Sequence, residues 1–271
     1  MKLTSYLPFS RSVMQTFLSY GINAFIFMFG SFLRVFLAYY LWMAIFNSSG
    51  GDSLQGYNRG EMALYVVIME FIVRMTGAAE ADYWVGEEVR SGAIAMNLIK
   101  PISYTGRILA MGFGGLAYEL ICVFIPMGIL VRIAGALWLN MTFPGLAQFA
   151  FFMLSILMGF FILFSLNLAF GFLAFHLKNM WGLSNVKFMI TYFLSGAMIP
   201  LAFFPQWAQP VLRALPFSSI HYIPAQIFLG RLEGMDMYRS LAVQGIWVLV
   251  FFGLSQLIYR GAIRHLTVQG G

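Results

Sequence analysis

Residues 146–175 read Leu-Ala-Gln-Phe-Ala-Phe-Phe-Met-Leu-Ser-Ile-Leu-Met-Gly-Phe-Phe-Ile-Leu-Phe-Ser-Leu-Asn-Leu-Ala-Phe-Gly-Phe-Leu-Ala-Phe, a run without one Asp, Glu, Lys or Arg. The same absence of charge extends over residues 133–177 and recurs over 188–212 and 240–259. A helix needs about 20 apolar residues to cross a bilayer, and these runs reach that length. Their apolar residues are continuous rather than alternating, which argues against a membrane β-barrel. The sequence therefore predicts an all-α integral membrane protein.

The composition agrees with a chain that lies in lipid. Of the 271 residues, 61% are hydrophobic and only 10% are charged, whereas about a quarter of the residues of a soluble domain are charged. The net charge of +6 reflects arginines near expected span ends, so it does not indicate nucleic-acid binding. The single Cys122 and the three scattered histidines form neither an internal disulfide nor a metal site.

We expect one transmembrane permease domain over residues 1–271, with an interfacial amphipathic helix within residues 1–20. The apolar residues between Tyr6 and Ser19 fall near helical spacing, as in a helix that lies in the membrane surface. Six spans are expected after it, at about 22–46, 61–79, 108–133, 146–175, 184–204 and 240–259.

The segment 205–239, before the last span, is unlike an ordinary loop. Its prolines divide it into pieces too short to cross the membrane. Its content of Leu, Phe and Ile is nevertheless too high for a free loop. We expect short helices that re-enter the outer leaflet, with an extracytoplasmic gate formed by Pro205, Pro216, Phe217 and Pro224.

Lysine and arginine counts in the loops predict the orientation. If both termini are cytoplasmic, nine of these residues lie on the inner side and five on the outer side. Because inner loops carry the excess of positive charge, this bias predicts cytoplasmic termini. It also places residues 81–107 in the cytoplasm.

Acidic residues are concentrated around the start of that loop. Four of the chain's 10 acidic residues lie at Glu80, Asp82, Glu87 and Glu88. Such a concentration in one loop of a membrane protein indicates a docking surface. The alternative is a solvated loop whose charges only keep it out of lipid.

Three features follow one another along the chain. The first is an interfacial helix that precedes six spans. The second span is followed by Glu88-Val89-Arg90-Ser91-Gly92 and then by Leu98-Ile99-Lys100-Pro101. The last span is preceded by Leu215-Pro216-Phe217, Pro224 and Leu229-Gly230. This order resembles the membrane subunits of ABC exporters of the type-2 (ABC-2) permease class over nearly the whole chain. The phosphate-binding motif Gly-x-x-x-x-Gly-Lys-Ser/Thr is absent. If the transport uses ATP, we therefore expect another chain to hydrolyse it.

The resemblance implies that residues 81–107 form a cytoplasmic coupling loop seated in a cleft of an ATPase subunit. Glu87, Glu88 and Arg90 offer charges to that partner, Trp84 offers an apolar anchor, and Gly92 can end a short helix. The resemblance further implies two ATPase copies that carry ATP and Mg, a second permease that is identical or paralogous, and the bacterial cytoplasmic (inner) membrane. We expect no catalytic residue and no bound cofactor in this chain itself.

Four charged residues lie inside the expected spans: Arg34, Glu70, Arg74 and Glu119. A lone charge at the centre of a membrane helix costs about 2.5–3.5 kcal/mol by the lower estimates, so each should have a partner. Glu70 and Arg74 are spaced for an i,i+4 pair, and Arg34 can reach Glu70 or Glu119. The cluster either clamps helices together or lines a substrate path, which we expect near the first, second and fifth spans.

A proton-coupled secondary transporter that uses Arg34, Glu70 and Glu119 is the alternative function. The six expected spans show no internal repeat, whereas many such carriers consist of repeated halves. This alternative also leaves the charge cluster around residues 81–107 unexplained. The sequence therefore favours the exporter permease.

Overall fold

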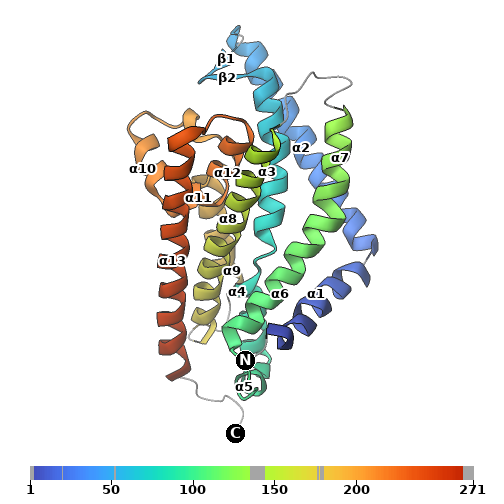
Figure 1. Ribbon diagram of the computed structural model, residues 1–271, viewed down its shortest axis with the longest axis vertical. Helices are drawn as coiled ribbons and strands as arrows, with labels where there is room; N and C mark the ends of the chain where they lie inside the picture. The colour runs from blue at the N-terminus through green and yellow to red at the C-terminus, as the bar shows by residue number, and fades with distance from the viewer. Residues whose placement is uncertain are drawn as a thin grey trace.

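The computed structural model describes residues 3–19, 21–51, 53–134, 144–175, 177 and 180–264. Most of its long helices run along one axis and form an elongated bundle (Figure 1). By length and composition, five helical stretches in the described residues can cross a membrane. They are Met28–Ser49, Arg59–Arg90, Tyr104–Ile129, Leu146–Phe175 and Gly234–Arg264.

The helices of these stretches follow five of the expected spans closely. Four are α2 (Gly21–Ser49), α3 (Arg59–Gly77), α8 (Leu146–Phe172) with the 3-10 turn η4 (Leu173–Phe175), and α13 (Gly234–Arg264). The expected third span is composite and consists of α6 (Tyr104–Tyr118), the π-helical segment η2 (Glu119–Phe124) and α7 (Ile125–Ala134).

The expected fifth span is interrupted. Helix α9 (Trp181–Leu194) has 14 residues, and the 3-10 turn η5 (Leu201–Phe203) follows it. Fourteen residues extend about 21 Å, less than the hydrocarbon core of about 30 Å. Gly196 adopts a left-handed backbone with φ of +83°, which ends the helical course. One continuous helix over 184–204 is therefore a wrong prediction, and the count of six spans stays a prediction.

Helix α8 lies at the centre and packs against α13, α3, α4 (Ala81–Arg90) and α12 (Tyr222–Phe228). Two of its glycines allow other segments to approach its backbone. A Cβ on Gly159 would lie 2.6 Å from the carbonyl oxygen of Ile220, and one on Gly171 would lie 2.9 Å from the Cβ of Val85. No side chain fits at either distance, so both contacts require glycine.

The segment 205–239 turns back along α8, and its re-entry into the outer leaflet stays a prediction. Ile220 contacts α8 at Gly159, about halfway along that helix. Further on, the amide of Gln148, near the start of α8, donates a hydrogen bond of 2.6 Å to the carbonyl of Ile227. The chain therefore goes down to the middle of α8 and comes back, through three short helices: α10 (Ala208–Ala214), α11 (Pro216–Ile220) and α12 (Tyr222–Phe228).

The two ends of the bundle differ. One end carries the antiparallel pair β1 (Ser53–Leu54) and β2 (Tyr57–Asn58) and the helix α10 (Figure 1). At the other end lie the start of α1 (Leu7–Ser19), preceded by η1 (Leu3–Ser5), and the end of α13. Helix α1 packs on α6, where Gly114 leaves room for the backbone of Ser10. Its position in the membrane surface stays a prediction.

We expect Gly171→Val to lower the free energy of unfolding by about 1–3 kcal/mol, because the added methyl groups overlap Val85 and the backbone of α4. Gly253→Val in α13 is the matched control, since nothing lies within 4 Å of a Cβ at that position. Thermal unfolding in detergent compares the two variants. Equal melting temperatures would contradict the close packing of α4 on α8.

Candidate functional site

The stretch 81–107 is largely helical. Gly92 has a left-handed backbone with φ of +75° and separates two helices, as expected of a glycine that ends a helix. The first of these two helices is α4, and only residues 78–80 separate it from α3. Helix α4 therefore continues the second span after a bend. The expected coupling loop thus consists mainly of two helices: α4 (Ala81–Arg90) and α5 (Ala93–Leu98).

Glu88 does not lie at the surface where we expected it. Its carboxylate accepts a hydrogen bond of 2.6 Å from the guanidinium of Arg107 and one of 3.0 Å from the hydroxyl of Tyr104. The side chains of Arg107 and Glu88 are only 5% and 15% exposed. The guanidinium also lies over the rings of Tyr104 and Phe9. Glu88 lies on the face of α4 that packs against α6, so it joins these two helices, and its role in coupling stays a prediction.

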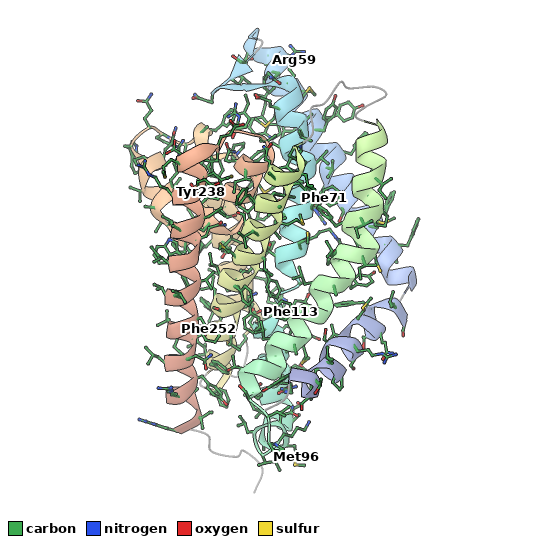
Figure 2. The ribbon with its side chains drawn as sticks, in the orientation of Figure 1. Arg59, Phe71, Met96, Phe113, Tyr238 and Phe252 are labelled. Atoms are coloured by element: carbon green, nitrogen blue, oxygen red, sulfur yellow. The ribbon has the colours of Figure 1, made fainter. Side chains whose placement is uncertain are left out.

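Glu87 and Arg90 lie on the outer face of α4. Their side chains form an ion pair of 2.7 Å and are 45% and 71% exposed. Beyond them, Met96 and Ile99 are exposed on and just after α5. Met96 lies at the end of the molecule opposite Arg59 (Figure 2). Trp84, which we expected as an anchor, is half-buried and packs against the core around α4 and α8.

The first turn of α4 is held by a second polar network. Asp82 accepts hydrogen bonds from the ammonium group of Lys187 at 2.6 Å and from the hydroxyl of Ser184 at 2.9 Å. Lys187 also donates to the amide oxygen of Asn167 at 2.6 Å, and Asn167 donates to the carbonyl of Ala79. This network connects α4, α8 and α9. Neither the pairing of Asp82 with Lys187 nor the role of Asn167 was predicted from the sequence.

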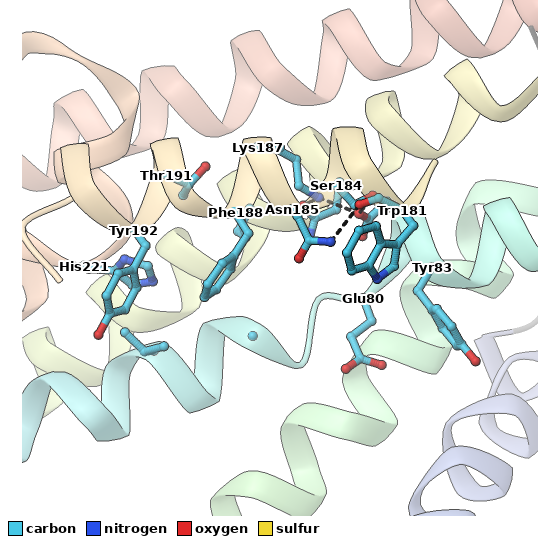
Figure 3. Close-up of a pocket in the computed structure, with 15 residues that line it drawn as sticks. Glu80, Tyr83, Trp181, Ser184, Asn185, Lys187, Phe188, Thr191, Tyr192 and His221 are labelled. Carbon is cyan, nitrogen blue, oxygen red and sulfur yellow. Dashed lines mark hydrogen bonds and ion pairs between the residues drawn. The ribbon is translucent and has the colours of Figure 1, made fainter. Parts of the chain in front are cut away.

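A pocket of about 500 Å³ lies beside this network, between α9 and the junction of α3 with α4. Its two ends differ (Figure 3). Trp181, Tyr83 and Glu80 lie at one end, and Tyr192 and the buried His221 lie at the other. The ring nitrogens of His221 lie within hydrogen-bonding distance of the hydroxyls of Thr76 and Ser195, so this histidine is satisfied inside the fold.

The four intramembrane charges form two ion pairs between helices. Arg34 on α2 pairs with Glu70 at 2.7 Å, and Arg74 pairs with Glu119 at 2.8 Å. Both guanidinium groups also donate to the hydroxyl of Ser31. The expected i,i+4 pair of Glu70 with Arg74 is not formed, because the two side chains face different neighbours, α2 and η2. Each charge has an opposite partner, which is the geometry of an interhelical clamp.

The expected gate residues lie in different surroundings. Pro205 is exposed, whereas Pro216 and Pro224 are buried at the beginnings of α11 and α12. Phe217 is half-buried and packs against a small cluster that contains Ile162 and Leu163 of α8. The structure therefore does not bring the four residues together in one opening, and their role as a gate stays a prediction.

We expect Glu88→Gln to destabilise the protein by about 3–5 kcal/mol, because it leaves the charge of Arg107 buried without its partner. Glu87→Gln makes the same chemical change in the exposed pair and should cost about 1 kcal/mol or less. Unfolding in detergent measures both variants. A loss for Glu87→Gln as large as that for Glu88→Gln would contradict the different roles of the two carboxylates.

A known protein family matches nearly the whole chain, including most of the helices and ion pairs described above. Residues 32–270 match the family described as ABC-2 family transporter protein. The match begins within α2 and includes α4, α5, the pocket and both intramembrane ion pairs. No match is found among curated proteins. Together with the five apolar helices of spanning length, the family match shows that the chain is a multi-pass membrane protein and belongs to the ABC-2 transporter family.

Proposed function

We propose that this chain is the permease subunit of an ATP-driven exporter. In this proposal it pairs with a second permease, identical or paralogous, to form the substrate path. Two copies of a separate ATPase subunit bind ATP and Mg²⁺ and drive the transport. The family match supports a permease of an ABC transporter. The observation that carries the proposal is the exposed surface at the α5 end of the bundle.

The proposed docking surface consists of Glu87, Arg90, Met96 and Ile99. It combines an exposed ion pair with two exposed apolar side chains at the end of the molecule. A cleft in a partner protein can bury such apolar side chains and pair with such charges. Glu88 and Trp84 contribute indirectly, because they hold α4 against the rest of the bundle.

The proposed location is the bacterial cytoplasmic membrane, with the α5 end and both termini in the cytoplasm. Helix α1 begins at this end, and helix α13 ends there (Figure 1). Positively charged side chains at this end fit the rule that cytoplasmic segments carry the excess of Lys and Arg. They include Arg90, Lys100, Arg260 and Arg264.

The proton-coupled alternative has less support from the geometry. Glu70 and Glu119, the carboxylates that it would use, are each held in an ion pair with an arginine. A carrier that used these carboxylates would have to break the ion pairs that hold α3 to α2 and to η2. The exposed surface around α5 also has no role in a carrier that works alone.

Met96→Asp should reduce recovery of the ATPase subunit with the tagged permease from the native host by about tenfold, because it places a charge in an apolar contact. Met235→Asp is the control, since Met235 is 65% exposed and Met96 is 66% exposed. Met235 begins α13 at the opposite end. The co-purified ATPase is measured by mass spectrometry.

Equal loss of the ATPase with both variants would contradict docking at α5. A wild-type permease that purifies without any ATPase would contradict the exporter proposal and favour the gradient-driven carrier.

A further inference from the structure

We propose that the pocket beside α9 binds amphipathic organic cations, with Glu80 as their counter-charge. The pocket is lined by α3, α4, α8 and α9, and neither the family match nor the docking surface assigns a ligand to it. Transport of such a cation rests on the exporter proposal. Binding of the cation to this chain does not, so the two can fail separately.

The lining of the pocket has a net negative charge. Glu80, Asp82 and Lys187 supply the carboxylate and ammonium groups of the lining, and the buried ring of His221 lies at the other end. Asp82 and Lys187 cancel each other in their ion pair. The carboxylate of Glu80 forms no hydrogen bond or ion pair with any residue that the structure describes. The pocket therefore keeps one negative charge that a bound cation can neutralise.

The same network disfavours an anion. Lys187 is the one cationic side chain of the lining, and its ammonium group already donates to Asp82 and Asn167 at 2.6 Å each. Its side chain is only 8% exposed. An anion in the pocket would meet the two carboxylates of Asp82 and Glu80 without a free positive charge, and a repulsive element of this kind gives selectivity.

Aromatic side chains line the pocket along α9 and beside Glu80. Trp181, Phe188 and Tyr192 come from one side of α9, and Tyr83 comes from α4, next to Glu80 (Figure 3). Trp181, Phe188 and Tyr83 are exposed. The faces of such rings attract cations, most strongly those of Trp and Tyr. The aromatic side chains also offer apolar contact to the body of an amphipathic molecule.

The size of the pocket fits a small organic molecule. Its volume of about 500 Å³ lies within the range of about 300–1,000 Å³ that is typical of small-molecule sites. From Trp181 to Tyr192, it follows α9 for about 16 Å. Glu80 lies at one end of this length, and the apolar side chains of Val73 and Leu163 also line it. A molecule with one cationic group and an apolar body matches this division.

Two ions of the same shape and opposite charge test the proposal. We would measure binding of tetraphenylphosphonium and of tetraphenylborate to the purified full-length chain in detergent by equilibrium dialysis, without ATP. We expect the phosphonium to bind at least about tenfold more tightly, because the pocket carries one net negative charge. Glu80→Gln should weaken phosphonium binding by about tenfold, while Glu80→Asp should retain most of it.

Asp236→Asn is the matched control, since Asp236 lies at the exposed start of α13 and should leave both affinities unchanged. Equal binding of the two ions, or equal phosphonium binding by the wild type and Glu80→Gln at unchanged melting temperature, would overturn the proposal. Because the assay needs no ATPase, such a result leaves the exporter proposal untouched. Loss of ATPase co-purification would conversely leave cation binding untouched.

Discussion

Two buried ion pairs hold helix α4, one near each of its ends. Asp82 pairs with Lys187 of α9, and Glu88 pairs with Arg107 of α6. In each pair both side chains are at most 15% exposed, so removing either partner would leave a charge without compensation in a poorly solvated place. Close contact with α8 at Gly171 fixes the helix from a third side. The position of α4 is therefore determined by three neighbouring helices at once.

This constraint connects the two proposed functional surfaces. The first turn of α4 contributes Asp82 and Tyr83 to the pocket, and its last turn carries Glu87 and Arg90. The helix has 10 residues and extends about 15 Å. Packed helices move as rigid elements, so a partner that docked at the end of α4 as proposed and displaced this helix would also displace one wall of the pocket.

The sequence predicts the elements better than their partners. Residues 146–175 form α8 and η4 as predicted, because a long charge-free run in a membrane satisfies its backbone hydrogen bonds by forming a helix. Residues 188–204 are also free of charge, yet the helix does not continue past Gly196, whose carbonyl accepts a hydrogen bond from Tyr65 on another helix. Hydropathy likewise does not give the rotation of each helix, so the partners of Arg74 and Glu88 could not be assigned. Asn167, a rare amide within the apolar run, was the available signal for the network around α4.

If an ATPase docks at the end of α4 as proposed, we expect α4 to transmit movement from the docking surface to the pocket. This expectation is tested most directly by the reactivity of Tyr83→Cys toward a maleimide in a Cys122→Ala background, which removes the chain's single native cysteine. The permease–ATPase complex would be labelled with and without a non-hydrolysable ATP analogue, and Met235→Cys would serve as the reference at the opposite end. We expect nucleotide to change the labelling rate of Tyr83→Cys and to leave that of Met235→Cys unchanged. Equal rates at Tyr83→Cys in both states, with the ATPase bound, would contradict it.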